Sequence, residues 1–390
     1  NYEANMLPTG QRIYFGTKGE DNAFDTWSGS SYFRSETLKT YTNKLYVFYG
    51  RQNNNNKTAY EEWPACVEGV EVTSDTPDKV RITRQGLENG MHFFEYQVAA
   101  GEYGNYTLTA TVTLKDGTTR YATYRVVVYE NAQFNNVTVR NGEELETALT
   151  SATLLPGMYI YMQPGDYTGD FEADMPVTLR TQSIPAIQYN QDGSPKLREN
   201  GATINGSITA LVEDVLVMGL DFVGNGTGTA LTDARVSTSN IFTGYATALE
   251  QEKNIHNSVS LSISGNAFAG NGTALRFVDR EWYTYLSNNI FWHNDTAVEY
   301  GSGCTIEGQY SPTHGAVMTR GSMIRNVFYL EDGQKALVNA SRNQATVNLS
   351  YNYFQQGDVT VPQAAMFDGP ALYSPFYETA DFGAITTDET

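Results

Sequence analysis

Three charged residues occupy the same position of a repeated phrase. Glu250, Arg276 and Glu299 each follow directly after a Thr-Ala-Leu or Thr-Ala-Val triplet. If the preceding Leu or Val faces inward, strand alternation directs the three charged side chains outward. On adjacent strands they form an acid–base–acid ladder, which can hold a sugar, bind Ca²⁺ or serve acid–base chemistry. A cross-strand salt-bridge ladder that contributes little to stability gives the same pattern, and it is the more frequent case.

A second set of candidates surrounds Asn289. Aromatic rings beside polar side chains are typical of carbohydrate sites, because the CH-rich face of a sugar stacks on a ring while its hydroxyls form hydrogen bonds. The segment therefore predicts a saccharide platform if its loops emerge on one side. Tryptophans that simply cover the fold would give the same composition. The candidates are Asp279, Arg280, Trp282, Tyr283, Tyr285, Trp292 and His293.

A lyase needs more than these residues. β-Elimination of a uronide requires Ca²⁺ or Arg against the carboxylate, and a Lys or Arg with a tuned pKa as the base. Lys253, Arg276 and Arg280 qualify by residue type only. The four histidines lack metal-ligand spacing and no phosphate-binding glycine loop occurs. We therefore predict no metal site and no cofactor, except Ca²⁺ if the protein is a lyase.

A repeated Asn-x-Phe phrase must position these residues. The Phe residues of successive copies lie 20, 26, 23, 37 and 26 residues apart, and most copies are followed by Thr-Ala-Leu or a near copy. A drifting period of this length indicates stacked coils, since one unit cannot bury its apolar face alone. We predict a right-handed parallel β-helix, with one Phe per coil stacked inside at ~4.8 Å and Asn at the turns. A β-sandwich with coincidental Asn-x-Phe pairs is the alternative.

The segment before the repeat has the pattern of an end cap. Residues 141–149 carry acids in the first turn of a predicted helix, which would cover the open end of the coil stack. The phrases GEELETALTSA, MYIYMQPGDYTGDF and ATINGSI follow from residue 142 onward. With them, residues 132–390 resemble the pectate-lyase-like β-helix superfamily. This resemblance implies a fold but no particular activity.

The N-terminal third has a different sequence pattern. Residues 35–130 contain short alternating runs and an Asp116-Gly117 hairpin signal. The phrase from Glu102 to Leu108 resembles the tyrosine corner of immunoglobulin-like sandwiches. We predict an extended lead-in over residues 1–34, an immunoglobulin-like β-sandwich over 35–130 and the β-helix over 131–390. This order resembles outer-membrane glycan-utilisation lipoproteins of Bacteroidetes, which implies a lipid anchor upstream of Asn1.

Charge and hydropathy limit the partners. The chain has 44 Asp plus Glu against 25 Lys plus Arg, a net charge of −19. This balance excludes nucleic acid and anionic membranes as partners recognised through bulk charge. No stretch approaches the ~20 apolar residues of a membrane helix. The composition, rich in Tyr, Asn, Thr and Gly, favours an extracellular or outer-membrane-surface protein.

We therefore predict an all-β secreted or surface protein that binds a polysaccharide or surface glycan without cleaving it. A polysaccharide lyase or glycosidase acting on a uronic-acid-containing polysaccharide is one alternative. A structural adhesin with a protein partner is another. Any function must lie where the copies differ, in the insertion between Phe291 and Phe328 and in the segment before Asn289.

Overall fold

The computed structural model divides the chain into two compact units. The first comprises residues 1–135, 150–155 and 254–257, and the second comprises 136–149, 156–253 and 258–390. The described residues are 12–18, 23–26, 30–34, 40–52, 57–99, 104–129, 136–151, 154, 157–212, 214–252, 260–278, 280–281, 283–306, 308–319 and 321–386.

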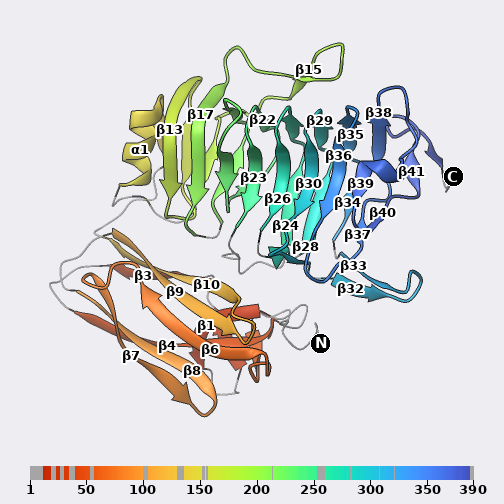
Figure 1. The fold of residues 1–390 in the computed structure, drawn as a ribbon. Helices are drawn as coiled ribbons and strands as arrows, with labels where there is room; N and C mark the ends of the chain where they lie inside the picture. Colours follow the sequence, from red (N-terminus) through yellow and green to blue (C-terminus); the bar gives the residue numbers. More distant parts are fainter. Residues whose placement is uncertain are drawn as a thin grey trace. The chain divides into compact units, whose positions relative to one another are not determined.

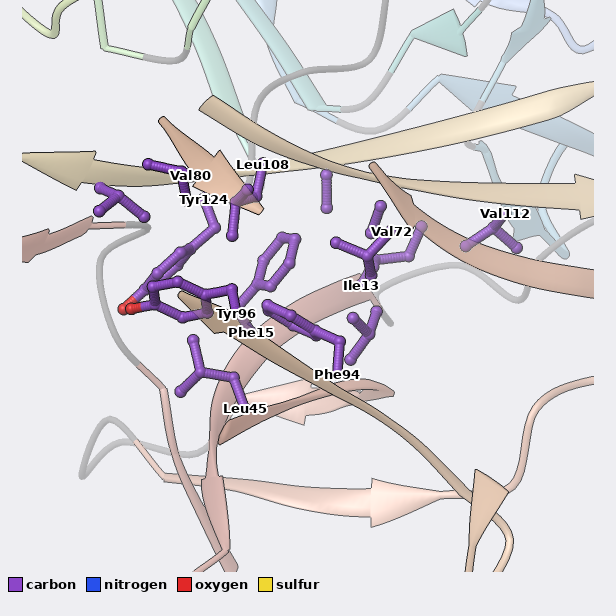
Figure 2. Packing of buried hydrophobic residues seen from close by; sticks show 14 of the residues in the cluster. Ile13, Phe15, Leu45, Val72, Val80, Phe94, Tyr96, Leu108, Val112 and Tyr124 are labelled. Carbon is purple, nitrogen blue, oxygen red and sulfur yellow. The ribbon is translucent and has the colours of Figure 1, made fainter. Parts of the chain in front are cut away.

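The first unit contains two β-sheets. Six strands form one sheet in the order β1-β2-β5-β4-β8-β7, and four form the other in the order β3-β10-β9-β6. The strands are β1 (Arg12–Lys18), β2 (Ala23–Thr26), β3 (Ser30–Arg34), β4 (Tyr41–Gln52), β5 (Lys57–Glu61), β6 (Val67–Ser74), β7 (Val80–Glu88), β8 (Met91–Val98), β9 (Gly104–Leu114) and β10 (Thr119–Tyr129). Alternate side chains of both sheets meet in one core, where Phe15 and Phe94 pack edge to face at 5.8 Å between ring centroids (Figure 2).

The predicted lead-in over residues 1–34 is wrong in its described part. β1 pairs antiparallel with β4, and β3 pairs in parallel with β10. The physical reason is alternation, because Ile13 and Phe15 lie two residues apart and are both buried in the core. The Asp116-Gly117 turn joins β9 to β10 as predicted. An immunoglobulin-like identity for this unit stays a prediction.

The predicted capping helix follows the first strand of the second unit, β11 (Val137–Val139). Helix α1 spans Gly142–Leu149 and buries Leu145, Ala148 and Leu149. Asn141 Oδ1 accepts a hydrogen bond from the Glu144 backbone N–H at 2.9 Å, while Glu144 Oε2 accepts one from the Arg140 N–H at 2.9 Å. These reciprocal bonds fix the start of the helix. Figure 1 shows α1 at one end of the coil stack, beside β13.

The coil stack consists of three columns of parallel strands, which confirms the predicted parallel β-helix (Figure 1). The first column contains β11 (Val137–Val139), β12 (Tyr159–Met162), β14 (Thr178–Arg180), β18 (Leu216–Met218), β21 (Arg235–Val236), β24 (Ser260–Ser264), β28 (Tyr283–Ser287), β34 (Met323–Ile324), β37 (Val347–Asn348) and β40 (Ala371–Leu372).

The second column contains β19 (Asp221–Val223), β22 (Ile241–Thr243), β25 (Ala267–Ala269), β29 (Ile290–Trp292), β35 (Val327–Leu330) and β38 (Tyr353–Gln356). The third contains β20 (Thr229–Thr232), β23 (Thr247–Gln251), β26 (Thr273–Phe277), β30 (Thr296–Tyr300), β36 (Lys335–Asn339) and β39 (Phe367–Asp368). The long strands β13 (Gly165–Ala173) and β17 (Ala202–Ala210) pair with each other, and β17 continues into both columns. At the bend of β17 a Cβ on Gly206 would lie 1.9 Å from the Gly169 carbonyl oxygen, so this position requires glycine.

The repeated Phe residues form the predicted interior stack. Their ring centroids lie 4.6, 5.0, 5.2, 4.9 and 5.0 Å apart from Phe222 to Phe354, with planes within 11° of parallel. The preceding Asn residues, Asn240 to Asn352, form a fully buried ladder. In this ladder each amide donates to the Oδ1 of the next, at 2.9, 3.3, 3.0 and 2.9 Å. Both predicted roles, Phe in the interior and Asn at the turns, are confirmed.

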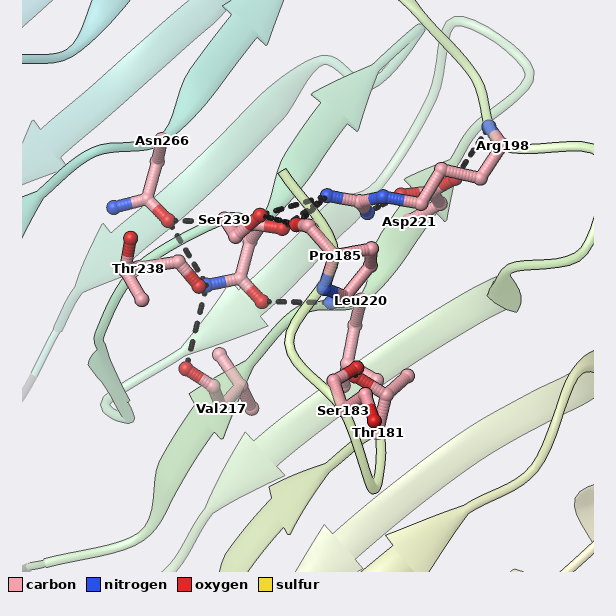
Figure 3. A network of polar contacts seen from close by, with 11 residues as sticks. Thr181, Ser183, Pro185, Arg198, Val217, Leu220, Asp221, Thr238, Ser239 and Asn266 are labelled. Atoms are coloured by element: carbon pink, nitrogen blue, oxygen red, sulfur yellow. Dashed lines mark hydrogen bonds and ion pairs between the residues drawn. The ribbon is translucent and has the colours of Figure 1, made fainter. Parts of the chain in front are cut away.

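A long excursion over residues 181–201 leaves the stack between β14 and β17. It carries a small hairpin, β15 (Gln188–Tyr189) and β16 (Pro195–Lys196). Arg198 anchors the excursion by an ion pair with the buried Asp221 and by donating to the Ser239 carbonyl at 2.6 Å (Figure 3). Burial raises the pKa of Asp221, and Arg198 opposes this rise. A buried ion pair therefore holds the excursion against the second column.

Candidate functional site

A hairpin fills the long interval between Phe291 and Phe328. Strands β32 (Gly308–Ser311) and β33 (Ala316–Thr319) pair antiparallel after the third-column strand β30 and before the first-column strand β34 (Figure 1). At the tip, the Gly315 N–H donates to the Ser311 carbonyl at 2.9 Å, and Gly315 has a φ of 62°. A Cβ on Gly308 would lie 2.3 Å from a Val317 methyl group, so the two strands approach closely there. The insertion is thus an ordered element that the coils present.

Backbone contacts attach the second strand of this hairpin to the first column. The Thr319 N–H donates to the Thr346 carbonyl at 2.9 Å, and the Thr346 N–H donates to the Val317 carbonyl at 2.7 Å. The Asn348 N–H in turn donates to Thr319 Oγ1 at 3.1 Å. The hairpin therefore runs beside β37, with its outer strand extending beyond the coil surface.

Between the hairpin and the first column lies a groove of about 630 Å³, here named the hairpin groove. It joins the two segments in which the repeat copies differ, since Tyr285 belongs to β28 and the hairpin belongs to the insertion. Tyr310 and Tyr285 are 61% and 44% exposed. The lining residues are Tyr285, Gln309, Tyr310, Ser311, Pro312, Met318, Thr319, Gly321 and Asn348.

Strand alternation orients Tyr285. Its neighbours Thr284 and Leu286 are fully buried, and Leu286 pairs with Met323 of the next coil. Tyr285 therefore faces away from the interior, on the same side as Ser262 of the preceding coil. Two exposed phenol rings, side-chain amides and hydroxyls in one concave surface can stack against a ring face and form hydrogen bonds around it.

The predicted acid–base–acid ladder also forms. Arg276 Nη1 lies 3.5 Å from Glu250 Oε2, and Arg276 Nε lies 3.3 Å from Glu299 Oε1. Thr273 Oγ1 donates to Glu299 Oε2 at 3.1 Å. Burial raises the pKa of Glu250, and Arg276 opposes this rise. The strand register assigned from the repeat is confirmed.

The ladder is half-buried, and its one cation is fully paired. The side chains of Glu250, Arg276 and Glu299 are 18%, 41% and 23% exposed, and the single guanidinium is shared by two carboxylates. An Arg neutralised in this way cannot also neutralise a uronide carboxylate without giving up one partner. Among the described residues, no group of three or more His, Cys, Asp or Glu has the arrangement of a metal site. The geometry therefore fits the salt-bridge interpretation of these three residues.

The remaining candidates that the structure describes do not form one platform. Lys253, Asp279 and Trp282 lie outside the described residues, as do the side chains of Arg280 and Tyr283. The backbone of Arg280 forms the short strand β27 (Arg280–Glu281), which pairs with β31 (Thr305–Ile306).

Trp292 and His293 lie on another face of the coil from Tyr285. Their rings stack at 3.7 Å between centroids at the end of the second-column strand β29, and His293 Nδ1 lies 3.3 Å from Glu331 Oε1. His293 lines a different cavity, of about 590 Å³, together with Tyr329 and Gln355. The structure thus separates Tyr285 from the Trp292–His293 pair.

Sequence reasoning missed the hairpin side of the groove. Tyr310 stands in the polar, glycine-flanked stretch GQYSPTHG, where an aromatic residue has no interior to pack against. That mismatch was the available signal. Gln309, Ser311 and Asn348 carried no signal, because their convergence depends on where the hairpin docks.

Comparisons with known proteins give little further information. No family model matches the chain, and no curated protein matches it. Among solved structures, a family 28 exopolygalacturonase from Yersinia enterocolitica aligns with 87% of this chain and 83% of its own, at 11% identity and a TM-score of 0.25. At that score the likeness carries no argument, so the fold assignment rests on the strand pairing above. Within the described residues, no helix has the length and apolarity needed to span a membrane.

Proposed function

We propose that this protein binds a saccharide in the hairpin groove and does not cleave it. The observation that supports this proposal is the pair of exposed rings, Tyr285 and Tyr310, lining one groove with amides and hydroxyls. Small-molecule sites typically have volumes of ~300–1,000 Å³ and combine apolar surface with a few polar groups, and this groove lies within that range.

The energetics favour stacking as the main contact. Tyrosine presents a large, rigid, amphipathic surface at a low cost in conformational entropy, because it has two χ angles. A CH-rich sugar face that covers Tyr310 removes apolar area from water, while the phenol hydroxyl stays available for hydrogen bonding. Contacts of this kind give selective but modest affinity per sugar, so we expect several units of a glycan to contribute.

The described lining of the groove holds no catalytic pair, which supports binding alone. Glycoside hydrolysis uses two carboxyl groups that flank the scissile bond, and elimination uses a base next to a neutralised carboxylate. The described lining of the groove contains no Asp, Glu, Lys, Arg or His. The paired carboxylates on the third column, Glu250 and Glu299, are held by Arg276.

The cellular setting is part of the same proposal. A secreted or outer-membrane-surface location would bring the groove to extracellular polysaccharide, and the two-sheet unit would then serve as a spacer. A lipid anchor upstream of Asn1 would complete this arrangement. Fractionation of the native host, with surface protease accessibility as the measurement, tests the location independently of the ligand.

The experiment is saccharide binding on an array, followed by titration calorimetry. Tyr310→Ala and Tyr285→Ala are expected to lower the affinity at least about tenfold, which corresponds to ~1.4 kcal/mol of lost binding free energy. Tyr310→Phe should retain much of the stacking. Tyr159→Ala is the matched control, since Tyr159 is a 39% exposed outward residue of the same column that does not line the groove.

Three results would contradict the proposal. Equal loss with Tyr159→Ala would indicate a general surface effect. Unsaturated-sugar absorbance on incubation with a uronide would show a lyase. Binding to a protein but to no saccharide would favour the adhesin.

A further inference from the structure

We infer that the hairpin groove selects uncharged saccharide units and excludes uronides. This inference rests on the proposed function, because it specifies the ligand of the same groove. The nine residues that line it in the described part of the chain are all uncharged. Their polar atoms are phenol and aliphatic hydroxyls, carboxamides and backbone groups.

The groove offers hydrogen-bonding groups of both kinds to the hydroxyls of a neutral sugar. Asn348 Oδ1 accepts from the Ser350 N–H at 3.1 Å, and no hydrogen bond from Asn348 Nδ2 occurs within the described residues. Thr319 Oγ1 already accepts from the Asn348 N–H, which leaves its proton to donate. The hydroxyls of Tyr285 and Tyr310 both donate and accept. A sugar hydroxyl likewise does both, so it can pair with each of these groups. The free donors would also serve a carboxylate, so the discrimination between the two ligands rests on charge.

Charge gives this discrimination. Moving a carboxylate from water into a groove whose described lining holds no cation costs free energy unless the charge is paired. The chain adds a long-range term of the same sign, because its net charge of −19 repels a polyanion at low ionic strength. Neither cost applies to an uncharged pyranose, whose CH face can stack on Tyr285 or Tyr310. The groove therefore favours neutral polysaccharide segments.

The test includes matched polymers that differ only at the carboxyl group, together with other neutral polymers. A panel of polyuronides, their carboxyl-reduced forms and neutral glucans, xylans, mannans and galactans is titrated against the whole chain. We expect neutral members to bind in a Tyr310-dependent manner. Their affinity should change less than about twofold between ionic strengths of ~0.01 and ~0.15 M, where the screening length falls from ~30 to ~8 Å. Added Ca²⁺ should have no effect.

Two variants sharpen the comparison. Asn348→Lys adds a cation to the groove and is expected to create salt-sensitive uronide binding. Arg320→Gln tests the cation that stands between the lining residues Thr319 and Gly321 in the sequence and lies outside the described residues. Affinity for neutral saccharide should be unchanged in this variant.

The outcomes are distinguishable. If the wild-type chain prefers a uronide, loses it in Tyr310→Ala and binds it less well as salt rises, the selectivity inference is overturned while the binding function stands. The same conclusion follows if Arg320→Gln abolishes binding. If no saccharide of either class binds, both the function and the selectivity are overturned.

Discussion

Truncating one member of the asparagine ladder, Asn289→Ala, should strongly destabilise the β-helix. Asn289 is fully buried, and its Oδ1 accepts from the Asn266 N–H and Nδ2 at 3.0 and 3.3 Å. Its Nδ2 donates to the Ile263 carbonyl at 2.9 Å and to Asn326 Oδ1 at 3.0 Å. The alanine variant removes all four bonds and leaves the Asn266 N–H without this partner inside the stack.

The magnitude follows from these bonds. A buried donor left without a partner costs ~1–3 kcal/mol, and each further lost hydrogen bond costs ~0.5–1.5 kcal/mol. Asn326 Oδ1 keeps its bond from the Asn289 N–H at 3.1 Å, and Asn266 Nδ2 keeps the Ser264 carbonyl at 3.0 Å, which limits the loss. We expect a decrease of about 2–5 kcal/mol in the free energy of unfolding.

Urea unfolding followed by tryptophan fluorescence measures this change. The control is Asn225→Ala, an exposed turn residue whose Oδ1 bonds only to nearby Thr227 within the described residues, with an expected change within ~0.5 kcal/mol. A second variant, Asn289→Asp, keeps the shape but buries a carboxylate that cannot donate. The loss in unfolding free energy of this variant should decrease as the pH falls, because the protonated carboxyl regains one donor. An unfolding free energy for Asn289→Ala within ~0.5 kcal/mol of wild type would refute the reasoning.

Two further predictions concern buried charge. Arg198→Met leaves the Asp221 carboxylate buried and uncompensated, so the free energy of unfolding, measured by thermal denaturation, should fall by about 3–5 kcal/mol. The double variant Arg198→Met with Asp221→Leu should recover most of this loss. An unchanged stability of Arg198→Met would contradict this role of the ion pair. Burial raises the folded-state pKa of Glu250. Ionising it therefore costs stability, and this cost is absent at acid pH and develops as the pH rises through the folded-state pKa. Glu250→Gln should raise the midpoint temperature of unfolding more at neutral pH than at acid pH. An equal rise at both pH values would contradict a cost of ionising Glu250.

The part of the fold that could be predicted from the sequence is the part that repeats. Each coil contacts only its neighbours, so Phe242, Phe268 and Phe291 meet similar surroundings and the chain shows the same residue at each. The ladder of Glu250, Arg276 and Glu299 followed from that register, without any long-range information. The strand at Arg12–Lys18 was missed because its partner, β4, lies some thirty residues away and shares no repeat with it.

The groove could not be predicted because the residues that form it do not repeat from coil to coil. First-column strands are short, and their outward-facing positions show no repeated residue type. The sequence therefore offers no way to align Tyr285 with residues of neighbouring coils. Tyr310 reaches it only because β33 pairs with the segment around Thr346. Trp292 resembled Tyr285 in the sequence, yet strand alternation on a different column directs it elsewhere.

The inserted hairpin leaves the interior unchanged. Phe291 and Phe328 are 37 residues apart and stack at 4.9 Å, while Phe268 and Phe291 are 23 apart and stack at 5.2 Å. The coil frame thus tolerates added length at this corner without loss of stacking. Residues 308–319 should therefore be exchangeable as a cassette, so that laboratory grafting or natural divergence can alter recognition while the scaffold that carries it is inherited intact.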